Sequence, residues 1–231
     1  MRGAKRILTL VLFTVFITAY GQQIDYASWK EEAKTNIRLL PEYGNVTKTK
    51  EQKEADYGFI KLSLQQKGTR EKASEHMVEL GFDYLYRTDL RTAMYRFNQA
   101  FLLNPKNENA YWGFGAVYFM FNDFENAMIQ YIKGLKINPK SSNILTDKAT
   151  VYLTIFNMTG NKINLDSATN IFKESYLVDA KNQNTLFKLS VCCFLNENCK
   201  DALRYYEECR VLGGRPITKE YIEALNKKCV K

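Results

Sequence analysis

The stretch AYWGFGAVYFMFNDFENAMIQYIKGLKINP, from Ala110 to Pro139, combines eight aromatic residues with three glycines. Glycine inside a helix costs about 0.5–1 kcal/mol relative to alanine, so its place among large apolar residues needs a reason. The stretch also resembles the sequence before it. A shift of 34 residues aligns positions of the same character in the two copies, and a fixed period of this size is typical of repeat proteins.

The match covers eight positions in each copy. In order, Met77, Leu80, Gly81, Tyr84, Ala93, Phe97, Ala100 and Pro105 correspond to Tyr111, Phe114, Gly115, Tyr118, Ala127, Tyr131, Gly134 and Pro139. Each copy predicts a first helix with large residues around one small residue, then a second helix with a small, large, small series, then a proline. This pattern resembles the tetratricopeptide repeat (TPR), which implies an all-α fold, a right-handed superhelical solenoid of stacked helix pairs.

Small residues set the spacing between helices in this interpretation. Gly81 and Gly115 are expected where the first helix of a unit lies close to the second, and Ala93 and Ala127 are small for the same reason. Aromatic side chains then fill the space beside these contacts.

The resemblance extends, with departures, to two further units. We expect units at residues 74–107, 108–141, 142–182 and 183–214, followed by a capping helix within 215–231. The third unit carries seven extra residues between its helices, around 157–165, and has Ser175 in place of its last alanine. The residue four before each second-helix alanine is a favourable N-cap type. These four residues are Asp89, Asp123, Asn164 and Asn198.

Residues 22–73 precede the repeats and are expected to form a helical amino-terminal segment. Helices are predicted over 24–40 and about 50–66, separated by Pro41-Glu42-Tyr43-Gly44. Two arrangements remain open. Either these helices fold back and fill the concave groove that the TPR resemblance implies, or that groove is free.

The resemblance also implies where a partner binds. In TPR proteins, positions 2, 5, 9, 12 and 13 of the first helices line a concave groove that receives a peptide or helix. The resulting candidates for partner binding are Val78, Phe82, Tyr86, Asn109, Trp112, Phe119, Met120, Asn143, Phe187 and Phe194. Their aromatic members form a larger surface than a monomer usually exposes. Asn109 and Asn143 are either ligand contacts or N-caps of their helices.

Five cysteines all lie after residue 190. If the second helix of the fourth unit runs antiparallel to the capping helix, Cys199 is level with Cys229, which predicts a disulfide between them. Such a bridge closes a loop of about 30 residues and stabilises the fold by roughly 3–4 kcal/mol on the chain-entropy model. Cys209 is expected to stay free in the core. Neither a CxxC redox pattern nor a zinc-ligand spacing is present.

No catalytic residue, cofactor or metal site is predicted. His76 is the only histidine and lies far in sequence from the cysteines, so a surface role is the default interpretation. The formal net charge is +8, but lysines alternate with acidic residues along the predicted helices, and no arginine-rich stripe is present. Nucleic acid is therefore not an expected partner.

The first residues predict export. Basic residues precede an uncharged apolar run from Ile7 to Tyr20, which predicts a signal peptide over residues 1–21 with cleavage before Gln22. An uncleaved membrane anchor is the alternative, although a bilayer needs about 20 apolar residues and this run is shorter. We expect a periplasmic or secreted protein with no stable membrane insertion after cleavage.

The leading functional hypothesis is an exported, non-enzymatic TPR scaffold that binds a protein or peptide through an aromatic-rich concave groove. The alternative is a repeat-containing hydrolase or thiol-dependent envelope factor that uses the third-unit insertion and the cysteine cluster. A purely structural part of an envelope assembly is a third possibility.

Overall fold

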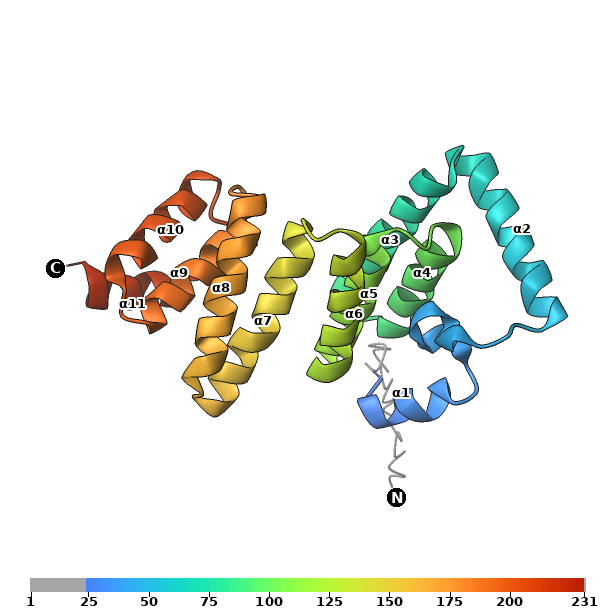
Figure 1. Ribbon diagram of the computed structural model, residues 1–231, viewed down its shortest axis with the longest axis horizontal. Coiled ribbons are helices and arrows are strands. Elements are labelled where there is room, and N and C mark those ends of the chain that lie inside the picture. The colour runs from blue at the N-terminus through green and yellow to red at the C-terminus, as the bar shows by residue number, and fades with distance from the viewer. Residues whose placement is uncertain (1–23, 231) are drawn as a thin grey trace, which may run out of the picture.

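The chain is helical throughout the computed structural model, which describes residues 24–230 (Figure 1). Within these residues there are eleven α-helices, two 3₁₀ helices and no strand. The α-helices are α1 (Tyr26–Ala33), α2 (Lys50–Lys67), α3 (Arg70–Tyr86), α4 (Leu90–Leu103), α5 (Glu108–Met120), α6 (Phe124–Ile137), α7 (Ser142–Thr159), α8 (Lys162–Val178), α9 (Gln183–Leu195), α10 (Cys199–Val211) and α11 (Lys219–Cys229). The 3₁₀ helices are η1 (Ile37–Leu39) and η2 (Pro41–Asn45).

From α3 onward the helices form four stacked pairs, which confirms the predicted all-α solenoid. The pairs are α3–α4, α5–α6, α7–α8 and α9–α10, and they follow one another along the long axis of the molecule (Figure 1). The first helix of each pair also contacts the first helix of the next pair. The helices α3, α5, α7 and α9 therefore share one continuous face, which we call the first-helix face.

Glycines bring the paired helices together as predicted. A Cβ atom at Gly81 would lie 2.4 Å from the ring of Phe97, and one at Gly115 would lie 2.3 Å from the ring of Tyr131. The repeat pattern does not explain Gly113, but the structure does, since a Cβ there would lie 2.2 Å from Phe97. The ring of Phe97 on α4 thus packs against glycines of both α3 and α5, and these glycines set the spacing within and between units.

Three of the four predicted N-caps are confirmed. The side chains of Asp89, Asp123 and Asn198 each accept a hydrogen bond from a backbone N–H in the first turn of the helix that follows. The prediction of Asn164 as an N-cap is wrong, because α8 begins earlier. Its N-cap is Asn161, whose side chain accepts a hydrogen bond from the N–H of Ile163 at 3.0 Å.

The extra residues of the third unit lengthen its helices, so the insertion predicted between them around 157–165 is wrong. Helices α7 and α8 have 18 and 17 residues, against 13 and 14 in α5 and α6. Nothing breaks the helix before Gly160, which ends α7 in a left-handed conformation at φ 69°. Leu165 is fully buried and Phe156 packs on the same cluster, so the added turns also extend the core.

The amino-terminal segment is less helical than predicted. Helix α1 ends at Ala33, and the chain then makes tight turns through η1 and η2, with positive φ at Glu42, Tyr43, Gly44 and Asn45. Instead of continuing as a helix, the chain after Ala33 is held by contacts with α4. The side chain of Asn98, which is fully buried, donates to the carbonyls of Arg38 and Leu40, both at 2.9 Å, and accepts from the N–H of Tyr43 at 3.0 Å. We call residues 24–49 the strap.

The strap lies against the second helices of the first two units. Arg91 on α4 pairs with Glu32 at 2.7 Å, and Lys133 on α6 pairs with Glu42 at 2.8 Å. The ring of Trp29 also lies 5.0 Å from that of Phe121, just before α6. The arrangement in which the amino-terminal helices fill the groove is therefore wrong for the strap, because its ion-pair partners, Arg91 and Lys133, lie on the second helices.

The second amino-terminal helix is confirmed as α2 and closes the end of the array. Phe59 and Ile60 pack against the cluster that contains Met77 and Val78 of α3. At the other end, α11 packs on α10 as the expected capping helix. The predicted signal peptide, residues 1–21, lies outside the described residues.

Candidate functional site

A hollow of about 150 Å³ opens in the middle of the first-helix face. It is lined by Leu85, Ala116, Phe119, Met120, Tyr131, Asp147, Thr150 and Lys188. These residues come from α3, α5, α6, α7 and α9, and none of them belongs to the strap. Four stacked units therefore combine to form one depression, which is large enough for a single side chain or a benzene-sized group.

The rings of Phe119 and Tyr131 line the hollow, and further aromatic rings lie beside it. The rings of Phe82 and Trp112 lie 4.2 Å apart, and Tyr86 lies 6.2 Å from Phe82. Tyr86 is 76% exposed and Met120 is 39% exposed, so large side chains face solvent at the rim. These sequence candidates do come together on the first-helix face.

Two ionisable groups occupy the floor beside Trp112. The indole Nε1 of Trp112 donates to Asp147 Oδ2 at 2.6 Å, and Lys188 Nζ donates to Thr150 Oγ1 at 2.7 Å. Burial raises the pKa of Asp147 despite the neighbouring Lys188. Burial lowers the pKa of Lys188 despite Asp147. Each charge is thus only partly compensated by the protein itself.

Asp147 and Lys188 are residues that the sequence reasoning missed. Asp147 lies 34 residues after Gly113, and Lys188 lies 41 after Asp147, which equals the distance between the starts of the third and fourth units. Both therefore stand at the sixth position of their units. The signal was two opposite charges at equivalent positions of adjacent first helices, which places them side by side.

Three predicted partner-binding residues are not free to line the hollow. Val78 is only 7% exposed and belongs to the cluster that packs against α2, so its assignment to the groove is wrong. Phe187 and Phe194 pack edge-on against Tyr221 of α11, with ring centroids 5.4 and 5.8 Å away. They hold the capping helix in place, because α11 covers this side of α9.

The asparagines at the second position of α5 and α7 do not cap those helices. The N-caps are Asn107 for α5 and Ser141 for α7, so the capping interpretation of Asn109 and Asn143 is wrong. Asn143 is exposed and its side-chain oxygen accepts from Asn182 at 3.2 Å. Asn109 is partly buried. Both remain candidates for ligand contact.

Cys199 and Cys229 are joined by a disulfide in the structure, with their Cα atoms 5.2 Å apart. The other cysteines are buried as free thiols. Burial raises the pKa of Cys192 to about 12 and also raises the pKa values of Cys193 and Cys209. These thiols stay protonated at neutral pH and are therefore poor nucleophiles.

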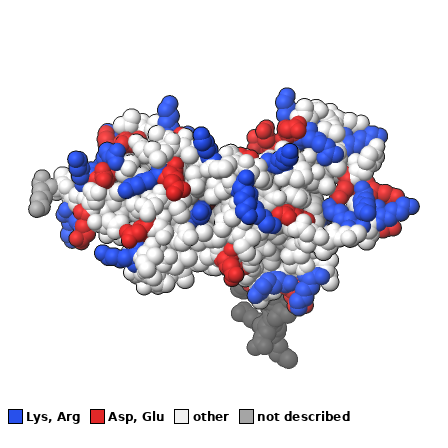
Figure 2. Space-filling view, viewed as in Figure 1, with Lys and Arg blue, Asp and Glu red and all other residues white. Residues whose placement is uncertain are grey.

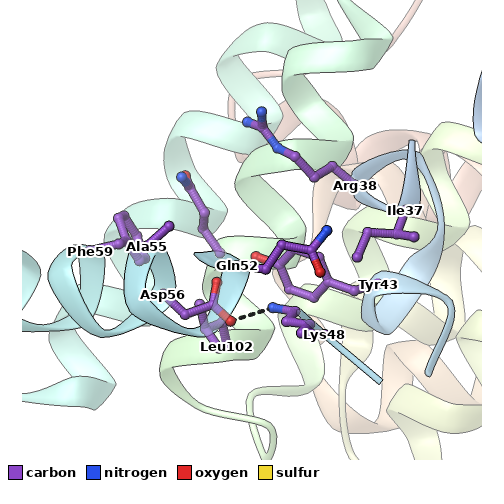
Figure 3. A pocket seen from close by; sticks show the side chains of 10 residues that line it. Ile37, Arg38, Tyr43, Lys48, Gln52, Ala55, Asp56, Phe59 and Leu102 are labelled. Atoms are coloured by element: carbon purple, nitrogen blue, oxygen red, sulfur yellow. Dashed lines mark hydrogen bonds and ion pairs between the residues drawn. The ribbon is translucent and has the colours of Figure 1, made fainter. Parts of the chain in front are cut away.

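A second hollow, of about 240 Å³, lies between the strap, α2 and α4 (Figure 3). Lys48 Nζ pairs with Asp56 at 2.5 Å and also lies 3.4 Å from the ring centroid of Tyr43. Lys48 and Asp56 therefore compensate each other, and Arg38, which also lines this hollow, has its guanidinium 3.8 Å from the ring centroid of Tyr95. Its polar contacts fix the strap to α2, which makes it a weaker candidate for ligand binding than the hollow at Asp147.

Within residues 24–230, the charged side chains are mixed in sign and form no metal-binding group. Figure 2 shows lysine, arginine, aspartate and glutamate interspersed over the face in view. Between residues 24 and 230, no group of three or more histidine, cysteine or acidic side chains could hold a metal ion. His76 lies on the surface of α3, with Nδ1 3.5 Å from Glu79. A helix both long and apolar enough to cross a bilayer is also absent from this range.

Comparisons with known proteins bear on the fold. No family model matches the chain, and no curated protein matches it. TTC0263, a thermophilic TPR protein of Thermus thermophilus, has 14% sequence identity and a TM-score of 0.55 over 67% of this chain and 80% of that chain. MamA has 13% identity and a TM-score of 0.48, covering 74% and 98% of the two chains. YrrB, described as a TPR protein with an unusual peptide-binding site, has 15% identity and a TM-score of 0.35, covering 73% and 97%. With TTC0263 as its structural neighbour and four stacked helix pairs, this chain has a TPR-type solenoid fold.

Proposed function

We propose that this chain is a non-enzymatic scaffold that binds a protein or peptide partner on its first-helix face, through Phe82, Tyr86, Trp112, Phe119 and Met120. The observation that carries the proposal is the hollow beside these residues. Its walls come from four units, so it exists only in the assembled stack. Solvent-exposed aromatic and thioether groups beside a surface depression are features of protein contact sites.

The position of the strap supports this proposal. It covers the outer side of α4 and α6, where Asn98 and Lys133 bind it, and leaves the first-helix face uncovered. Because the helices that carry the rim residues are already packed, a partner would lose little free energy to reorganisation of the scaffold on binding.

The alternative, an enzyme that uses the third-unit insertion and the cysteines, has less support. The insertion extends two helices instead of forming a loop that could carry catalytic groups. The thiols of Cys192, Cys193 and Cys209 are buried, with raised pKa values. A nucleophilic cysteine needs the reverse, a lowered pKa and access to substrate.

Export to the periplasm or the cell exterior is part of the same proposal and rests on the sequence of residues 1–21. Disulfides form in such compartments, and a bridge between Cys199 and Cys229 fits this location. Amino-terminal sequencing of the protein from its native host should find Gln22 as the first residue. An intact Met1 on protein recovered from the cytoplasm would contradict export.

The binding surface can be tested by changing exposed rim residues. Tyr86→Ala combined with Met120→Ala removes two side chains that are 76% and 39% exposed, so the helices should keep their stability. Purified wild-type and variant proteins would be immobilised and compared for the partners that they retain, identified by mass spectrometry. We expect specific partners to be lost from the variant.

The matched control is Tyr57→Ala, which removes a 70% exposed aromatic from α2, away from the hollow. This variant should retain the partners of the wild-type protein. Equal recovery of every partner by all three proteins would exclude the first-helix face as the binding surface. A circular dichroism spectrum of each variant confirms that its helices are intact.

A further inference from the structure

The hollow at Asp147 has the chemistry of a site for a cationic side chain. Asp147 is partly buried and accepts one hydrogen bond, from Trp112. It belongs to none of the ion pairs formed between residues 24 and 230. A carboxylate that is removed from water without an ion-pair partner is unfavourable, and an incoming cation relieves that cost.

The walls suit the stem of a long basic side chain. Leu85, Ala116, Phe119 and Met120 present apolar surface, and Asp147 and Thr150 present polar atoms. Lysine and arginine bury their methylene stems against apolar surface while their charged ends seek polar partners. An arginine would in addition stack on an aromatic ring at the rim.

The surface beside the hollow carries a matching negative charge. Four carboxylates stand four residues apart along α3, all exposed, with Lys72 as a cation among them. They are Glu71, Glu75, Glu79 and Asp83. At 100° per residue this row shares a side of α3 with Phe82 and Tyr86. The ring of Phe82 lies 4.2 Å from that of Trp112, which donates to Asp147, so this side of α3 lies next to the hollow.

We propose that the first-helix face recognises a basic segment of a partner protein, with one lysine or arginine side chain in the hollow paired to Asp147 and neighbouring cations along the carboxylate row of α3. This inference rests on the function proposed above and specifies the chemistry of the partner. Lys188 lines the same hollow and carries a positive charge, like the side chain that we propose to bind there. Its hydrogen bond to Thr150 holds its ammonium, but its charge reduces the affinity for a cation.

Peptides of defined charge test the inference. The probes are fluorescein-labelled peptides of glycine, leucine and lysine, with both termini blocked so that only side chains differ. Analogues carry norleucine or glutamate in place of lysine. Fluorescence anisotropy at low ionic strength should give an affinity for the lysine peptide about tenfold or more above that for the norleucine peptide, as expected for one charge-assisted hydrogen bond. The glutamate peptide should bind more weakly still, and added salt should reduce the differences.

Variants assign the effect to the hollow. Asp147→Asn should remove most of the preference for the lysine peptide over the norleucine peptide, whereas Lys188→Met should tighten binding of the lysine peptide. The matched control is Asp166→Asn, an exposed carboxylate on α8, which should behave as wild type. Equal binding of all three peptides, or Asp147→Asn equal to Asp166→Asn, would overturn the inference.

The two proposals fail in different ways. If peptides bind without regard to charge and lose affinity in Trp112→Ala plus Phe119→Ala, the face is a binding surface and only the basic partner is wrong. If that double variant changes the affinity of no peptide, the proposed function itself fails.

Discussion

Replacing Gly113 by alanine tests the idea that glycines fix the spacing between units. The added Cβ would lie 2.2, 2.3 and 2.5 Å from three ring carbons of Phe97, where ordinary van der Waals contact begins near 3.4 Å. The ring would have to withdraw by more than about 1 Å. It cannot do so easily, because Gly81 on α3 already stands at a similar close approach to the same ring.

Two effects of opposite sign decide the magnitude. Overpacking a core typically costs about 1–3 kcal/mol, and the tight enclosure of Phe97 favours the upper end. Alanine gains about 1 kcal/mol of helix propensity over glycine, which offsets part of that loss. The expected net change is a loss of about 1–2 kcal/mol in the free energy of unfolding, or a fall of roughly 2–8 °C in Tm for a chain of this length.

Thermal unfolding followed by circular dichroism measures the change. The control is Gly58→Ala on α2, where an added Cβ meets nothing within 4 Å. That variant should gain about 0.5–1 kcal/mol, because only helix propensity acts. Adding Phe97→Leu to Gly113→Ala should recover about 1 kcal/mol relative to the sum of the single changes. A Gly113→Ala protein as stable as Gly58→Ala would refute the reasoning.

Three further outcomes are expected from local contacts. Asn161→Ala should lower the free energy of unfolding in urea by about 0.5–2 kcal/mol, while Asn164→Ala should change it little, because only Asn161 caps α8. Reduction of the bridge between Cys199 and Cys229 should lower the free energy of unfolding by about 3–4 kcal/mol for a separation of 30 residues. If all five cysteines of the denatured, unreduced protein can be alkylated, the bridge is absent. Asp147→Asn should raise Tm at pH 7. The pKa of Asp147 is higher in the folded protein than in the unfolded chain, so wild-type stability falls as pH rises through that folded pKa. The gain in Tm from Asp147→Asn should therefore vanish below about pH 3.9, where the carboxyl group is protonated in both states.

The contacts within one unit could be predicted from sequence because they recur with the repeat. Gly81 and Gly115 share a position, and each faces the aromatic residue of its own second helix. Gly113 could not be explained this way, since it contacts Phe97 of the preceding unit and its repeat equivalent is the exposed Glu79. A contact between two units does not recur along the array when the residues at the equivalent positions differ in size.

The charged residues on the floor of the hollow could not be predicted from the sequence for a related reason. Asp147 and Lys188 stand at equivalent positions, but the residues at that position in the first two units are Glu79 and Gly113, which have no common chemistry. The conformation of the strap was still harder to predict. Its conformation depends on Asn98, which binds carbonyls 58 and 60 residues away in sequence, and helical periodicity carries no information about such pairs.

The strap also changes how the array should come apart. In a simple stack each unit touches only its neighbours, so unfolding can begin at either end. Here one segment bonds to Asn98 in the first pair and to Lys133 in the second, which ties those pairs into one cooperative block. Amide hydrogen exchange should therefore give the helices from α3 to α6 a common opening free energy. Partial unfolding would start beyond them, in the half of the molecule that the strap does not reach.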